Sequence, residues 1–149
     1  MTGRDPMPAL TKYYDFVNQL SVGSHNLQTA VYRLALTNTA PSLTDINWNT
    51  TTYPAPAAVA GYTSGGNTPA VTSASTVNGL FKLILANTIF SASGGQIGPF
   101  RYAILYNSST TGTLNRVIGW YDYGSSFSLN DQETYTFNFD ATNGVFTMA

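Results

Sequence analysis

The chain has 149 residues, enough for one domain with its own hydrophobic core. Only 9% of the residues are charged, against roughly 25% in an average globular protein, and the net charge is −1. Six Lys and Arg residues give no basic surface for nucleic acid, and the absence of cysteine excludes a disulfide framework and any thiolate site. No apolar run has the length of a membrane-spanning helix, and the first ten residues do not resemble a secretory signal.

Residues 1–9 (MTGRDPMPA) contain two prolines and a glycine, which is the composition of an extended N-terminal arm. We expect this arm to precede a single domain over residues 10–149, and a neighbouring subunit is one candidate for what holds it. The candidate interface residues of the arm are Met1, Arg4, Pro6, Met7 and Pro8.

Residues 10–22 place apolar side chains at the spacing of a helix and predict one short amphipathic helix. We expect Thr11 to be its N-cap and Gly23 to end it. The predicted buried stripe consists of Tyr13, Phe16, Val17 and Leu20, with Lys12 and Tyr14 beside it.

From residue 29 onward the apolar pattern has a period of two, and short segments are separated by Gly and Asn turns. This pattern predicts an all-β fold, a β-sandwich of jelly-roll or Ig-like type preceded by the helix. In residues 100–107 both faces are apolar, which predicts a central strand covered on two sides. The other expected strands are residues 29–36, 57–62, 70–75, 80–85, 87–91, 116–123, 127–129, 134–139 and 144–148, with a hairpin connection at 140–144.

Residues 37–68 form a long segment rich in Thr, Pro and Gly, and a loop of that length is often functional. Its aromatic residues Trp48, Tyr53 and Tyr62 are candidate interface anchors, because large rings contribute much of the binding energy at protein interfaces. The alternative is that these rings fold back on the core of their own domain.

Few residues could carry chemistry. His25 follows the predicted helix, and we expect it to be a loop or core histidine, since no second histidine exists for a typical metal site. The glycine-rich residues 94–98 (GGQIG) lack a following lysine, so we expect no phosphate site there.

The carboxylates also favour structural roles. Asp131 and Glu133 stand at a turn, where charged groups are usually solvated, although their proximity would suit glycoside cleavage. Asp122 lies among aromatic residues and is expected to pair with Arg101 or Arg116, with a sugar-binding site as the alternative. We therefore expect no catalytic residue, no metal ligand and no cofactor, and hence no enzyme.

Several stretches are more specific than their composition. Together they resemble a group of small virion proteins of tailed bacteriophages, encoded beside the capsid genes, and the resemblance spans about residues 13–149. The stretches are residues 98–107 (GPFRYAILYN), 118–124 (IGWYDYG), 136–140 (TFNFD) and 144–147 (GVFT), with 25–27, 34–41 and 61–62 upstream.

The resemblance implies a capsid decoration, or cement, protein that binds the outer surface of the head and stabilises contacts between capsid subunits. Its partners would be the major capsid protein and further copies of itself, as a dimer or trimer. It would reside on the capsid surface of the virion, and in the host cytoplasm during assembly. The alternative is a tail-fibre or spike domain that recognises a host glycan through Trp48, Trp120, Tyr121 and Asp122.

Overall fold

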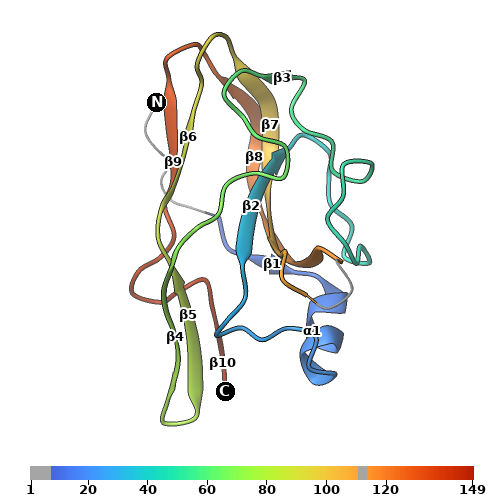
Figure 1. Ribbon diagram of the computed structural model, residues 1–149, viewed down its shortest axis with the longest axis vertical. Coiled ribbons are helices and arrows are strands. Elements are labelled where there is room, and N and C mark those ends of the chain that lie inside the picture. Colours follow the sequence, from blue (N-terminus) through green and yellow to red (C-terminus); the bar gives the residue numbers. More distant parts are fainter. Residues whose placement is uncertain (1–7, 111–113) are drawn as a thin grey trace.

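A computed structural model describes residues 8–110 and 114–149 of the chain. Within these residues it contains ten strands and one short helix (Figure 1). The elements are β1 (Thr11–Lys12), α1 (Tyr14–Ser21), β2 (Tyr32–Thr37), β3 (Ala58–Val59), β4 (Val71–Val77), β5 (Leu80–Leu85), β6 (Thr88–Ser91), β7 (Ile97–Asn107), β8 (Arg116–Leu129), β9 (Thr134–Phe137) and β10 (Phe146–Met148).

The strands form one large sheet and two small ones. The large sheet has the order β1-β8-β7-β2, with β3 joined to the start of β7, and every pairing is antiparallel. The three-stranded sheet β10-β5-β4 and the pair β6-β9 lie opposite one face of the large sheet, at the lower and upper end of the view in Figure 1. The expected all-β sandwich with one short helix is confirmed.

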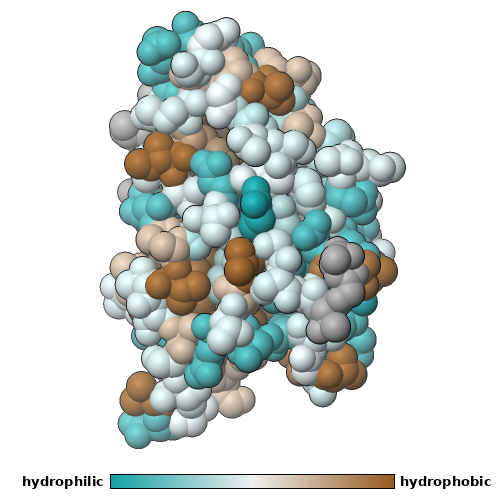
Figure 2. All heavy atoms as spheres, in the orientation of Figure 1, coloured by the Kyte–Doolittle hydropathy of each residue, from teal (hydrophilic) through white to brown (hydrophobic). Residues whose placement is uncertain are grey.

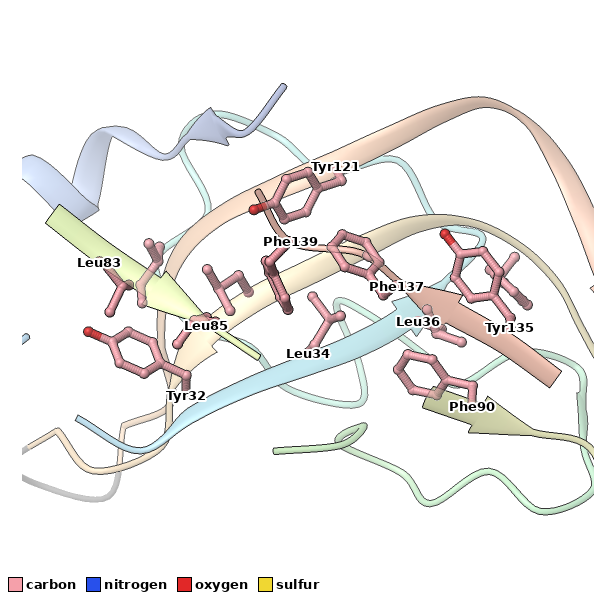
Figure 3. Packing of buried hydrophobic residues seen from close by; sticks show 14 of the residues in the cluster. Tyr32, Leu34, Leu36, Leu83, Leu85, Phe90, Tyr121, Tyr135, Phe137 and Phe139 are labelled. Carbon is pink, nitrogen blue, oxygen red and sulfur yellow. The ribbon is translucent and has the colours of Figure 1, made fainter. Parts of the chain in front are cut away.

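The main core lies between the large sheet and the two small ones. Side chains of β2, β5, β6 and β9 point toward one another in Figure 3. Aromatic rings fill much of the space: the ring centroids of Tyr121 and Phe137 lie 4.8 Å apart, as do those of Phe137 and Phe139. The predicted alternation of residues 134–139 is confirmed, since Tyr135, Phe137 and Phe139 are buried.

The other face of the large sheet carries a second, smaller core. Ala103 and Leu105 of β7 face the main core, whereas Tyr102, Ile104 and Tyr106 belong to this second cluster. Strand β7 lies between β8 and β2 and is buried on both faces, as its sequence predicted.

The helix is shorter than predicted, and one residue of its expected stripe is wrong. Thr11 is not the N-cap, because Thr11 and Lys12 pair with β8 instead of beginning the helix. The close approach of these two strands requires a glycine, since a Cβ on Gly119 would lie 2.7 Å from the carbonyl oxygen of Thr11. The helix presents Phe16 to the core, but Val17 is 61% exposed. The N-cap residue is Tyr13, which is buried as predicted, and Gly23 follows the helix with a positive φ of 77°.

The expected hairpin at residues 140–144 is also wrong. Strand β9 pairs with β6 and β10 pairs with β5, so the turn carries the chain from one small sheet to the other. The carboxylate of Asp140 accepts the backbone N–H groups of Thr142 and Asn143, each at 2.8 Å, and closes the turn locally. Residues 116–123 and 127–129 belong to one strand, β8.

Because Phe137 is fully buried in the main core, its truncation to alanine should leave a cavity. We expect Phe137→Ala to lower the free energy of unfolding by about 3–5 kcal/mol in a denaturant titration. Ile89→Ala on the paired strand β6 is the matched control, since this side chain is 57% exposed and its loss should cost no more than about 0.5 kcal/mol. Equal costs for the two variants would contradict the register of β6 and β9.

Candidate functional site

The long segment between β2 and β4 covers the outer face of the large sheet. The indole of Trp48 stacks on the ring of Tyr106, with centroids 4.9 Å apart and planes 4° from parallel. The hydroxyl of Tyr106 donates to the carbonyl oxygen of Gly65 at 2.8 Å, and the guanidinium of Arg33 donates to that of Gly66 at 2.7 Å. These contacts hold the segment against the sheet at two distant points of its length.

Tyr53 is buried within this segment. Its hydroxyl donates to the carboxylate of Asp45 and lies 2.9 Å from the hydroxyl of Tyr13, which precedes the helix. Tyr13 and Tyr53 are each 1% exposed, and burial raises the pKa of both phenols far above the usual value. Tyr53 is therefore not an exposed interface anchor. Its ring folds back on its own domain, which was the alternative for the aromatic residues of this segment.

Tyr62 lies on the opposite side of the sheet from Trp48. Its hydroxyl accepts the N–H of Leu36 at 2.9 Å, and its ring packs 6.1 Å from that of Phe90 at the edge of the main core. Burial raises the pKa of Tyr62 to about 12. The three aromatic residues proposed as anchors therefore do not form one surface.

The expected arm lies mostly outside the described residues. Pro8 is partly buried and lines an open cavity of about 680 Å³ together with Lys12, Phe139 and Phe146. Residues 1–7 lie outside the described part of the chain, and they include the candidate interface residues Met1, Arg4, Pro6 and Met7.

An exposed apolar surface surrounds the helix instead. We call Tyr14, Val17, Leu43 and Ile46 the helix patch; they are 64%, 61%, 36% and 50% exposed, respectively. Tyr14 and Val17 are three residues apart on one face of the helix, and the N–H of Tyr14 donates to the carbonyl oxygen of Leu43 at 3.0 Å. The sequence correctly placed Tyr14 beside the buried stripe, and its spacing to Val17 was the signal that could have revealed this second face.

His25 is buried behind the helix. Its Nδ1 lies 3.2 Å from the amide nitrogen of Asn107, its ring meets Phe16 edge-on at 5.3 Å, and its Nε2 has no hydrogen-bond partner among the described residues. Burial lowers the pKa of His25 to about 4, while the nearby Asp15 and Arg116 act in opposite directions. The imidazole is thus a neutral core group at pH 7.

The carboxylates named from the sequence are engaged in local structure. Asp131 accepts the backbone N–H groups of Gly94 and Gly95 at 2.8 and 3.2 Å, so the glycine-rich turn holds a carboxylate of its own chain. Glu133 accepts the N–H of Asn130 at 2.7 Å. The two Gly amides hold the pKa of Asp131 below its usual value.

Asp122 pairs with Arg101 and not with Arg116. The guanidinium of Arg101 donates to both carboxylate oxygens of Asp122, at 2.7 and 3.0 Å, and this lowers the pKa of Asp122. Arg116 instead forms an ion pair with Asp15 at 3.2 Å. Of the two ion pairs that the sequence offered for Asp122, the pair with Arg101 is confirmed.

The four residues of the alternative glycan-binding site do not share one face, although Trp48 and Trp120 both pack against the second cluster. Tyr121 is 6% exposed and packs in the main core, whereas the ring of Trp120 lies 4.7 Å from that of Tyr13 on the outer face. Trp48 is stacked on Tyr106, and Asp122 is bound by Arg101. The structure does not bring these four side chains together.

Among residues 8–110 and 114–149, no three His, Asp or Glu side chains are grouped as metal ligands. The same residues contain no helix with the length and hydropathy of a membrane span. Comparisons of the chain with protein-family models, with curated proteins and with solved structures found no match.

The burial of His25 predicts a pH-dependent stability. Its pKa is about 4 in the folded chain and about 6.5 when unfolded, so the unfolded chain binds the additional proton between these values. The contribution of the neutral, buried imidazole to the free energy of unfolding should therefore be complete above pH 6.5. It should fall by on the order of 3 kcal/mol as the pH drops toward 4. Urea titrations between pH 7 and pH 4.5 would measure the loss.

His25→Gln provides the control, because glutamine can still bond Asn107 but does not titrate. The variant should show a much smaller slope over this pH range, whatever its stability at pH 7. A slope equal to that of the wild-type chain would show that other groups cause the dependence.

Proposed function

We propose that the protein is a virion structural protein of a tailed bacteriophage, without enzymatic activity, that decorates the outer surface of the capsid. It would dock on the major capsid protein through the helix patch and stabilise contacts between neighbouring capsid subunits. The observation that carries the proposal is the helix patch itself, four exposed apolar side chains gathered at the helix of a nearly uncharged domain.

The body behind the patch is suited to a mechanical role. Strand β7 is covered on both faces, and the aromatic contacts of the main core join the large sheet to β9. A domain packed in this way resists deformation, because close-packed interiors have low compressibility. A clamp across capsid subunits needs such a body.

The surface also permits many copies to lie close together. Figure 2 shows a face on which most residues are pale, of intermediate hydropathy, with small separate hydrophobic groups. The basic side chains of the described residues have partners in their own chain: Arg101 and Arg116 pair with aspartates, Arg33 and Lys82 donate to carbonyl oxygens, and Lys12 lies 5.8 Å from the ring centroid of Phe146. Neighbouring copies would therefore repel one another little.

Copy number in purified particles tests this function directly. Quantitative mass spectrometry should give a simple ratio of this chain to the major capsid protein. A few copies per particle would place the chain at the tail and favour host-glycan binding. Complete absence from the particle would contradict both functions.

Val17→Gln tests the docking surface. Glutamine keeps the helix but removes the exposed apolar group, so binding of the purified variant to heads lacking this protein should be at least about fivefold weaker. Ile89→Gln is the matched control, because Ile89 is similarly exposed but lies on β6, outside the helix patch. If both variants bind as well as the wild-type chain, the helix patch is not the docking surface.

A further inference from the structure

Strand β4 is an open edge of its sheet. It is the last strand in the order β10-β5-β4, and its residues Val71–Val77 (VTSASTV) include no charge and no proline. Edge strands of monomeric proteins are usually protected by lysine, proline, a bulge or a covering segment, because their free backbone groups can bind another strand. Among the residues that the structure describes, the only such feature at β4 is a register shift at its start, between Val71 and Ser73.

Other edges of the same chain are covered. The outer edge of β2 exchanges backbone hydrogen bonds with Asn67, at 2.8 and 3.1 Å. The outer edge of β8 is paired with β1, and the N–H of Val117 donates to the carbonyl oxygen of Ile46. The exposure of β4 therefore contrasts with the edges of β2 and β8, and in Figure 1 the β4–β5 hairpin extends at the lower end of the molecule, where a partner can reach it.

The geometry of the hairpin shows which backbone groups point outward. Asn78 and Gly79 form its two-residue turn with positive φ angles of 51° and 80°, as in a type I′ turn, so the flanking residues Val77 and Leu80 exchange both backbone hydrogen bonds. In an antiparallel ladder such pairs alternate, and the next residue of β4 that bonds to β5 is Ser75. The N–H and C=O groups of Ala74 and Thr76 consequently point away from β5.

These outward groups are symmetric about Ser75. When two β4 strands meet antiparallel around a two-fold axis at Ser75, Ala74 of each copy faces Thr76 of the other, and each such pair can exchange two hydrogen bonds. Ser73 of each copy then faces Val77 of the other. All these side chains are small and uncharged, so a second copy meets neither a steric obstacle nor repulsion between like charges.

We infer that β4 pairs with β4 of a second copy of this chain, antiparallel and centred on Ser75, to join two three-stranded sheets into one of six strands. The register satisfies the outward groups of both copies at once, which an isologous two-fold contact requires. The contact is short and falls below the roughly 1,000 Å² of a stable interface, so the free dimer is weak and in exchange with the monomer. The inference concerns the isolated chain and does not depend on the capsid proposal.

A cysteine scan tests the register, since the chain contains no cysteine of its own. In the inferred dimer the two Ser75 residues form a non-hydrogen-bonded pair with Cα atoms about 4.5 Å apart, within the range of a disulfide. Under mild oxidation, the Ser75→Cys variant should therefore form a disulfide-linked dimer, visible as a band of twice the mass on a non-reducing gel. Ser73→Cys is the matched control: its hydroxyl lies 3.2 Å from that of Ser75 on the same strand face, yet the two copies of residue 73 would be about 13 Å apart.

Equal rates of cross-linking for the two variants, or none for Ser75→Cys in a folded protein, would overturn the inference.

Lysine at the same positions gives an independent test by sedimentation of the untagged chain. The mass of the wild-type chain should rise with concentration, Ser75→Lys should remain monomeric because two ammonium groups would meet, and Ser73→Lys should still associate. A wild-type chain that stays monomeric at millimolar concentration, or a Ser75→Lys variant that associates like it, would also overturn the inference.

Discussion

The fold depends on the burial of strand β7 on both of its faces. Ala103 and Leu105 face the main core, while Ile104 and Tyr106 support the second cluster on the other side. A strand with two apolar faces is stable only if both are covered, so the small sheets must close one side and the long segment before β4 must close the other. The stacking of Trp48 on Tyr106 completes this second cover.

The sequence predicted the parts of the fold that depend on local periodicity. Alternation at period two located β2, β5, β7 and β9 and assigned the buried face of residues 134–139 correctly. It could not identify strand partners, since pairing depends on residues distant in the chain, and the turn at 140–144 therefore looked like a hairpin. The exposure of Val17 has the same kind of cause, because β1 takes up Thr11 and Lys12 and fixes where the helix begins and which face it turns inward.

The packing partners of aromatic residues in the long polar segment could not be predicted from the sequence. Tyr53 and Trp48 have the composition of interface anchors, but each meets a partner supplied by a distant element: Tyr13 before the helix and Tyr106 on β7. Asp122 shows the opposite case. Of its two candidate partners, Arg116 lies on the same predicted strand, whereas Arg101 lies on the preceding one, β7, next to the register position of Asp122. Site residues are thus predictable where strand adjacency limits the choice, and not where a long loop determines the contact.

Low charge connects the two proposed contact surfaces. The helix patch adjoins β8 of the large sheet, whereas β4 is the free edge of the opposite layer, so one copy could use both surfaces at the same time. Each contact by itself is small, but copies bound side by side on a shell would meet at a high effective concentration, and a weak β4 ladder would then form readily. Charged residues on β4 would prevent this pairing, whereas the scarcity of charge that gives a free chain little protection against self-association allows it on a crowded surface.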